Sequence, residues 1–371
     1  MLNQVQHDGT KTKPINKYTN SLTYTTMRRH DIDWLRVITI GLLLIYHIAI
    51  VFQPFGYMIG FMQNHESWRS LWIPMSMINI WRIPVLFFVS GMGVCFAIRK
   101  RNWKQLIKER SLRIFVPFLF GMLAITPLHI YLFQSFYDHP IAYKSGQGHL
   151  WFLLNIFIYV LILSPLFFYL KNNKRNKFIK VISRVFKTPF GLLIIVACFL
   201  VENQILQPQF YTLYAFTLHG YILGFIAFFF GFLIMQSGDN FWNNVLKYRW
   251  LYFSIAILLY SIRLIIYRLE APAFLQALES PFWIFAVFGF SYKHLNRAGN
   301  TLSYLSKAAY PVYIIHMVVL FLTSYFVLPM NVIPQGKFFI ICGTTFAICF
   351  IVYEFLIRRV KFVRPLFGLK V

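Results

Sequence analysis

The chain has 371 residues, of which 58% are apolar, 20% are aromatic and only 13% are charged. Soluble domains usually carry about 45–50% apolar and about 25% charged residues, so this composition excludes an ordinary soluble protein. The formal net charge of +25 would suit a nucleic-acid binder. Here, however, the basic residues alternate with apolar runs of about 20 residues, as they do in membrane proteins. We therefore expect the chain to contact a lipid bilayer and no nucleic acid.

The first thirty residues are polar and rich in Asn, Thr and Lys. They predict a disordered cytoplasmic tail over residues 1–30, followed by a membrane-embedded domain over residues 31–371. Ten long apolar runs lie in that domain. Each is expected to cross the bilayer as a helix, because the alternating pattern of a transmembrane barrel is absent. The fold class is thus all-α integral membrane, with predicted spans over residues 34–55, 78–98, 114–133, 150–170, 189–206, 212–235, 250–267, 276–292, 310–328 and 338–357.

The distribution of Lys and Arg predicts how these spans are oriented. The two terminal segments and the loops after the even-numbered spans together hold 29 of them, whereas the loops after the odd-numbered spans hold five. Lys and Arg accumulate on the cytoplasmic side of a membrane. We therefore expect both termini in the cytoplasm.

Span 1 contains two polar residues that need an explanation. A charged side chain in the middle of a span costs at least about 2.5–3.5 kcal/mol. Arg36 and His47 are eleven residues apart, which is about three helical turns, so they share one face and lie about 16 Å apart along the axis. We interpret the pair as functional. The alternative is that His47 only hydrogen-bonds a neighbouring helix.

Further polar residues occur in and after span 2. Arg82 is expected near the outer interface, where its side chain can reach water, and Ser90 lies in a stretch of small residues. Such stretches allow close approach by another helix or by a ligand. In the basic loop that follows, Arg110 and Arg113 are three apart. They are expected to share a helix face and to hold a phosphate, although the loop also serves as an orientation signal.

The later spans add His149 and Trp151 at the outer end of span 4 and His316 in the cytoplasmic half of span 9. Trp151 suits the aromatic belt of the membrane interface. His316 suits either proton or acyl transfer or a simple bond between helices. Glu202 and His219 flank an outer loop and are candidates to face an external acceptor.

No pattern predicts a metal site or a disulfide framework. The four cysteines lie inside apolar runs, with no CxxC pair and no His at metal-binding spacing. Buried thiols that pack as small apolar side chains are the expected state.

Six short motifs follow one another along the chain. They are Arg36 and His47 in DWLRVITIGLLLIYH, RIPVLFFVSG at 82–91, RSLRIFVP at 110–117, WFL at 151–153, YPVYIIH at 310–316 and RPLFG at 364–368. Together these motifs resemble acyltransferase family 3 membrane proteins, which include glucan-modifying and O-antigen-modifying O-acyltransferases. The resemblance runs from about residue 30 to the C-terminus. Many O-antigen-type members carry a glutamate after the Trp of the fourth span, and WFLLNIFIY has no acid here.

The resemblance implies a membrane O-acyltransferase of the cytoplasmic (inner) membrane. Such an enzyme moves an acyl group, acetyl or succinyl, from cytoplasmic acyl-CoA to a hydroxyl of an extracytoplasmic polysaccharide or oligosaccharide. Acyl-CoA would be a co-substrate, and no permanently bound cofactor is implied.

The residues fit that activity in a specific way. The CoA phosphates would contact Arg110, Arg113 and Arg36, and the thioester would lie near His47. His47 would act as a general base or as a nucleophile, and the sequence does not choose between these roles. The remaining candidates for contacts with the oxyanion or the acceptor are Arg82, Ser90, His149, Trp151 and His316.

A second class of function also explains polar residues within spans. In a transporter or flippase, Arg36, Arg82 and His47 would line the path of the substrate. Such a protein would neither be labelled by an acyl-CoA nor hydrolyse one.

Overall fold

A computed structural model describes residues 28–173 and 176–370, and all regular structure in these ranges is helical. Ten helical segments are long and apolar enough to cross a membrane, which confirms the predicted all-α, ten-span architecture. Except for residues 28–30, the predicted tail over 1–30 lies outside the described residues. The α-helices are α2 (His30–Ile50), α3 (Trp72–Ile98), α4 (Trp103–Arg110), α5 (Val116–Phe120), α6 (Thr126–Phe136), α7 (Trp151–Asn172), α8 (Lys177–Val185), α9 (Pro189–Leu206), α10 (Leu218–Gln236), α11 (Asp239–Ile265), α12 (Ala273–His294), α13 (Asn300–Val327) and α14 (Pro334–Val352).

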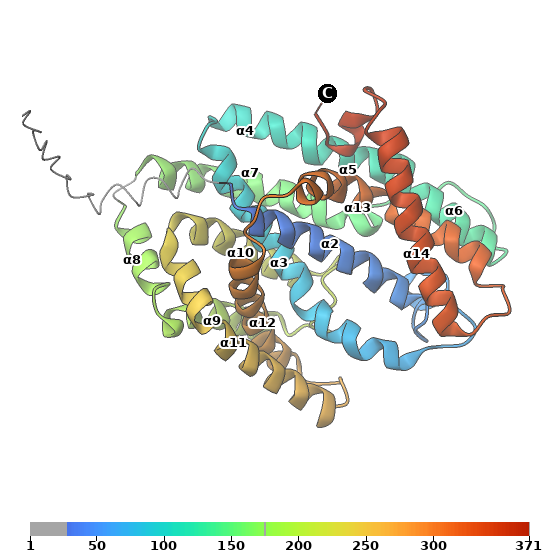
Figure 1. Ribbon diagram of the computed structural model, residues 1–371, viewed down its shortest axis with the longest axis horizontal. Helices are drawn as coiled ribbons and strands as arrows, with labels where there is room; N and C mark the ends of the chain where they lie inside the picture. Colours follow the sequence, from blue (N-terminus) through green and yellow to red (C-terminus); the bar gives the residue numbers. More distant parts are fainter. Residues whose placement is uncertain (1–27, 174–175, 371) are drawn as a thin grey trace, which may run out of the picture.

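The helices pack around a central group. α2 and α3 lie side by side, α13 packs against α2, and α10 packs against α3 (Figure 1). α9, α11 and α12 form one flank, whereas α14 covers the opposite flank through its contacts with α13. Three of the central helices therefore carry predicted site residues: α2 carries Arg36 and His47, α3 carries Arg82 and α13 carries His316.

Close contact between α3 and α10 depends on glycine. A Cβ atom on Gly91 would lie 1.9 Å from the carbonyl oxygen of Phe228, and one on Gly231 would lie 2.0 Å from that of Phe88. Neither distance is sterically possible, so both positions require the absence of a side chain. Gly91 thus serves helix packing, whereas the neighbouring Ser90 and Gly93 line a cavity.

The third span is one helical run from Trp103 to Phe136, interrupted by the π-helical turns η3 (Ser111–Phe115) and η4 (Gly121–Ile125). A proline follows closely after each π-turn, at Pro117 and Pro127. Proline has no N–H to donate and crowds the carbonyl four residues earlier, so the helix widens there rather than breaking. η3 consequently places Arg113 on a widened turn and not on a regular α-helix.

Proline within α3 has a comparable effect. Pro84 cannot bond the carbonyl of Ile80. That oxygen accepts hydrogen bonds from the hydroxyls of Tyr214 (3.1 Å) and Ser280 (2.8 Å) instead. The loop before α10 and helix α12 thus both bond α3 at Ile80, two residues before Arg82.

Glu202 and His219 do not face an external acceptor, contrary to the expectation from sequence. Both side chains are buried, and Nδ1 of His219 forms a hydrogen bond of 2.7 Å with Oε1 of Glu202. The second ring nitrogen of His219 lies 2.7 Å from the carbonyl oxygen of Tyr211. The last turn of α9 and the first turn of α10 face each other, and the pair fixes the loop between them.

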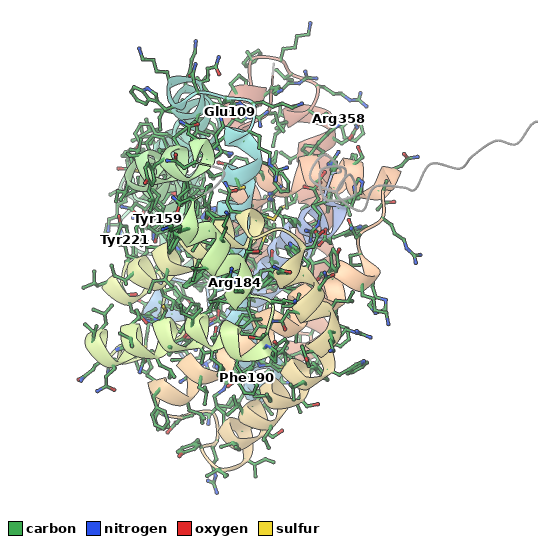
Figure 2. All side chains as sticks on the ribbon, turned by 90° about the vertical axis from the view of Figure 1, so that its left-hand side faces the viewer. Glu109, Tyr159, Arg184, Phe190, Tyr221 and Arg358 are labelled. Atoms are coloured by element: carbon green, nitrogen blue, oxygen red, sulfur yellow. The ribbon has the colours of Figure 1, made fainter. Side chains whose placement is uncertain are left out.

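Thiol labelling in intact cells would test the predicted orientation directly. Cysteines introduced at Asn102 and Asn173 are expected to be shielded from a membrane-impermeant thiol reagent in intact cells, whereas one at Gly146 is expected to react. Asn102 and Asn173 are exposed, and a Cβ on Gly146 meets nothing within 4 Å, so the substitutions fit. Figure 2 shows the face that carries Glu109, Arg184 and Arg358, from the segments predicted to be cytoplasmic. Labelling at Asn173 would mean that the span count between residues 114 and 170 is wrong.

Candidate active site

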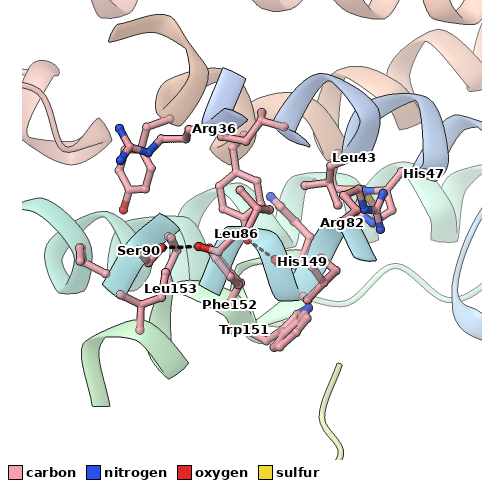
Figure 3. A pocket seen from close by; sticks show the side chains of 18 of the residues that line it. Arg36, Leu43, His47, Arg82, Leu86, Ser90, His149, Trp151, Phe152 and Leu153 are labelled. Atoms are coloured by element: carbon pink, nitrogen blue, oxygen red, sulfur yellow. Dashed lines mark hydrogen bonds between the residues drawn. The ribbon is translucent and has the colours of Figure 1, made fainter. Parts of the chain in front are cut away.

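A cavity of about 1070 Å³ lies among the central helices. Its lining includes residues near the start of α2 and α13 and residues from the loops after α2 and before α10, so it extends along the length of the spans (Figure 3). His316 is fully buried and contacts a lining residue, His47. The other predicted site residues line the cavity themselves: Arg36, His47, Arg82, Ser90, Arg110, Arg113, His149 and Trp151.

The charge of the cavity is entirely positive. Within residues 28–173 and 176–370, no Asp or Glu lines it. A cavity lined in this way attracts anionic ligands and repels cations. The cationic lining residues are Arg36, Arg82, Arg110, Arg113, Lys307, Arg358, Arg364 and Lys370.

Three arginines, Arg36, Arg110 and Arg113, line the end of the cavity near the start of α2. Arg36 lies 3.6 Å from Asp33, and Arg113 lies 3.3 Å from Glu109. Arg110 donates to the carbonyl of Gly93 at 3.5 Å, and its Nε atom has no hydrogen-bond partner. These guanidinium groups retain donors that can bind a phosphate.

The chain's last segment closes over this end, which the sequence did not reveal. Gly368 has a φ of +69°, and a Cβ there would lie 2.7 Å from the carbonyl oxygen of Arg113 and 2.5 Å from the ring of Tyr310. Only glycine fits, so the RPLFG segment at 364–368 packs directly on the turn that carries Arg113. From the sequence, this segment is only a motif of the family resemblance and has no predicted place in the site.

His47 and His316 form a hydrogen-bonded pair, with 2.9 Å between Nδ1 of His47 and Nε2 of His316. The Nδ1 atom of His316 lies 2.6 Å from the carbonyl oxygen of Tyr313. A carbonyl can only accept, so in the neutral ring Nδ1 of His316 carries the proton and its Nε2 accepts from His47. His47 then holds its own proton on Nδ1, and its Nε2 atom has a lone pair available for chemistry.

The contact corrects the predicted depth of His316. His47 is near the end of α2, and His316 lies beside it, so His316 is not in the cytoplasmic half of span 9. α13 begins at Asn300, ten residues before the predicted span. A depth counted from residue 310 therefore places His316 too close to the start of the helix.

Arg82 is also deeper than predicted. It is 2% exposed, so it does not reach water at the outer interface. α3 begins at Trp72, which places Arg82 well inside the helix. Its guanidinium donates to the carbonyl of Leu42 (3.3 Å) and to Asn79 (3.1 Å), and it lies 4.2 Å from the ring centroid of Tyr46. Nε has no partner, and no carboxylate among the described residues pairs with it.

The remaining predicted residues have more limited roles. The Ser90 hydroxyl donates to the carbonyl of Leu86 in its own helix at 2.7 Å. Nε2 of His149 lies 3.0 Å from the carbonyl oxygen of Ile314, and its Nδ1 has no partner. Trp151 is 9% exposed and packs near Phe87, so it does not belong to an aromatic belt.

A fourth histidine, His129 on α6, completes the group and was missed. Its ring centroid lies 6.0 Å from that of His149, which in turn lies 4.8 Å from that of His316. His129 lines the cavity and is 7% exposed. The argument that singled out His47, a histidine inside a predicted span, applies equally to His129 and would have found it.

Two further observations bear on the type of site. In the part of the chain that the structure describes, no group of three or more His, Cys, Asp or Glu side chains is placed to hold a metal ion. No curated protein and no solved structure matches the chain. The family model for the acyltransferase domain of acyltransferase family 3 matches residues 29–354. This match covers well over half of the sequence and every α-helix that lines the cavity, so the chain belongs to acyltransferase family 3 and is a multi-pass membrane acyltransferase.

Proposed function

We propose that the protein transfers an acyl group, acetyl or succinyl, from cytoplasmic acyl-CoA to a hydroxyl of an extracytoplasmic polysaccharide or oligosaccharide. The observation that carries this proposal is the cavity, which has arginines at one end, no lining carboxylate among the described residues, and His47 further along. CoA bears a diphosphate and a further phosphate, so a cationic entrance suits it. The protein would act in the cytoplasmic (inner) membrane without a permanently bound cofactor.

At the donor end, Arg110, Arg113 and Arg36 would contact the CoA phosphates. The segment over 364–368 would form one wall around the nucleotide part, because it packs on the turn of Arg113. The pantetheine arm would then follow α2 toward His47. Arg36 and His47 both line the cavity, and their axial separation of about 16 Å sets how far the arm must reach.

The chemistry would occur at Nε2 of His47. As a general base, this atom takes the proton of the acceptor hydroxyl while the hydroxyl oxygen attacks the thioester carbonyl carbon. The C–S bond then breaks, the proton passes to the CoA sulfur, and the products are an ester and free CoA. As a nucleophile, the same lone pair would first attack the thioester carbonyl carbon, so that the C–S bond breaks, CoA leaves as a thiolate and an acyl-imidazole forms. The acceptor hydroxyl would then attack the acyl carbon, the C–N bond would break to free the imidazole, and the hydroxyl proton would pass to the CoA sulfur.

Arg82 is the candidate for stabilising the negative oxygen of the tetrahedral intermediate. It is buried beside His47 without an acidic partner, and an unpaired buried charge is costly in a membrane. The developing oxyanion would supply the missing negative charge. His149, Trp151 and His129 would contact the acceptor from the other side of the cavity.

The decisive experiment uses purified protein in proteoliposomes with acetyl-CoA or succinyl-CoA that carries a radiolabelled acyl group. We expect label to move to an added oligosaccharide or to be released as free acid. Mass spectrometry of surface glycans from a deletion strain and its parent would identify the acceptor. A transporter or flippase would neither transfer nor hydrolyse the acyl group, and such a result would overturn the proposal.

The donor site gives a separate prediction. Arg113→Lys is expected to raise the apparent KM for acyl-CoA by about tenfold and Arg113→Ala by more, because a lysine cannot reproduce the two-donor fork of a guanidinium. Affinity and KM would be measured for both variants in one nanodisc preparation. If the lysine variant binds acyl-CoA as wild type does, Arg113 does not bind the donor and acts only as a topology signal. Lys and Arg are equivalent in that role, because both favour the cytoplasmic side of the membrane.

A further inference from the structure

A second cavity, of about 920 Å³, lies where the ends of α3 and α7 meet the start of α4. It shares no lining residue with the first cavity. The proposed acyl transfer makes no use of it. Its lining consists of Arg99, Lys100, Arg101, Asn102, Trp103, Ile107, Leu161, Ser164, Pro165, Phe168, Lys171 and Asn172.

The cavity has an apolar part and a cationic part at different depths. Leu161, Pro165 and Phe168 are spaced four and three residues apart, so they follow one face of α7. Lys171 is the next-to-last residue of α7, and Lys100 lies just after the end of α3. From Leu161 to Lys171 the helix rises about 15 Å, which separates the depth of acyl chains from that of headgroups.

Within the cationic part, Lys100 and Lys171 are not neutralised by an ion pair among the described residues. Arg101 pairs with Glu109 at 3.0 Å, but Glu109 is shared with Arg113. The Lys171 ammonium donates to the carbonyl of Arg101 at 3.3 Å. Over residues 28–173 and 176–370, no carboxylate forms an ion pair with Lys100 or Lys171.

We propose that this cavity binds an anionic glycerophospholipid of the cytoplasmic leaflet. The phosphodiester contacts Lys100 and Lys171, and one acyl chain lies along Leu161, Pro165 and Phe168. Trp103, which is 58% exposed, lies at the headgroup level beside it. A soluble phosphate would leave the apolar part unused, and a zwitterionic lipid would not balance the charge.

The test compares three forms of the full-length protein by native mass spectrometry from detergent. Wild type is titrated with phosphatidylglycerol and with phosphatidylcholine. Lys100→Gln/Lys171→Gln removes two charges from the cavity, and Lys177→Gln/Lys180→Gln removes two from exposed positions at the start of α8. Wild type and the α8 variant are expected to retain phosphatidylglycerol preferentially, and the cavity variant to lose about tenfold in its affinity. Equal retention by all three forms would overturn the proposal.

A second variant distinguishes a loss of lipid binding from faulty insertion into the membrane. Leu161→Trp fills the apolar part without changing charge and is expected to lower phosphatidylglycerol retention severalfold. Adding millimolar inorganic phosphate distinguishes the two sources of a phosphate group. If inorganic phosphate displaces the lipid, or Leu161→Trp retains it fully, the site recognises a phosphate alone and the lipid assignment is wrong. Acyl transfer by the same preparations is expected to stay at its wild-type basal rate in phosphatidylcholine.

Discussion

Replacing His47 by alanine is expected to lower the rate of acyl transfer by about 10²–10⁴-fold, the usual contribution of a general base. The substitution removes the nitrogen that holds the available lone pair. It leaves a small apolar side chain next to the cavity, which a membrane tolerates, so expression and insertion should remain normal. The measurement is the turnover of radiolabelled acyl-CoA by purified protein, together with glycan acylation in cells.

Two further variants sharpen this test. His47→Gln keeps a polar side chain that can hydrogen-bond but cannot take a proton at neutral pH, and it is expected to be as inactive as alanine. His294→Ala removes a histidine at the end of α12, outside the cavity, and is expected to leave transfer unchanged. Glycan acylation that persists in the His47→Ala strain at normal expression would remove His47 from the mechanism.

The second large effect is expected at His316, which we infer to be a positioning residue. Its Nε2 atom accepts the Nδ1 proton of His47, and its own Nδ1 is held by the carbonyl of Tyr313. In His316→Phe, the proton of His47 is no longer held on Nδ1. The corresponding loss of tautomer control in serine proteases costs about 10⁴-fold in kcat. We expect kcat to fall by at least about 10²-fold, with little change in the KM for acyl-CoA.

A conservative variant separates positioning from packing. In His316→Gln, the new side-chain oxygen can accept the hydrogen bond from Nδ1 of His47. The kcat of this variant is therefore expected to be at least about tenfold higher than that of His316→Phe. Phenylalanine and glutamine variants with equal activity would show that His316 only fills space between α2 and α13. A large rise in the KM for acyl-CoA would place it in donor binding instead.

The sequence predicted the spans well because hydropathy depends only on local composition. All ten apolar runs became helices, and the eleven-residue spacing placed Arg36 and His47 on one cavity. The positions of polar residues along the membrane normal were predicted less well. Arg82 and His316 were misplaced because their depths were counted from residues 78 and 310, whereas α3 and α13 begin several residues earlier.

Contacts between distant segments could not be predicted from one sequence. Nothing local indicates that Gly368 packs on the carbonyl of Arg113, or that the Ile80 carbonyl freed by Pro84 binds Tyr214. The same applies to the burial of Trp151, whose position at a span end is typical of an interfacial residue. Such features depend on how helices pack, and packing is set by the whole bundle.

The absence of carboxylates from the lining of the main cavity, within the described residues, also has a consequence for membrane permeability. In the proposed function, a passage that admits a donor from one side and an acceptor from the other would risk conducting ions down the electrochemical gradient. Fixed arginines impose an electrostatic barrier to protons and metal cations, as they do in selective pores. In that function, the cationic lining would let an energised cell keep the enzyme in its membrane without dissipating its proton-motive force.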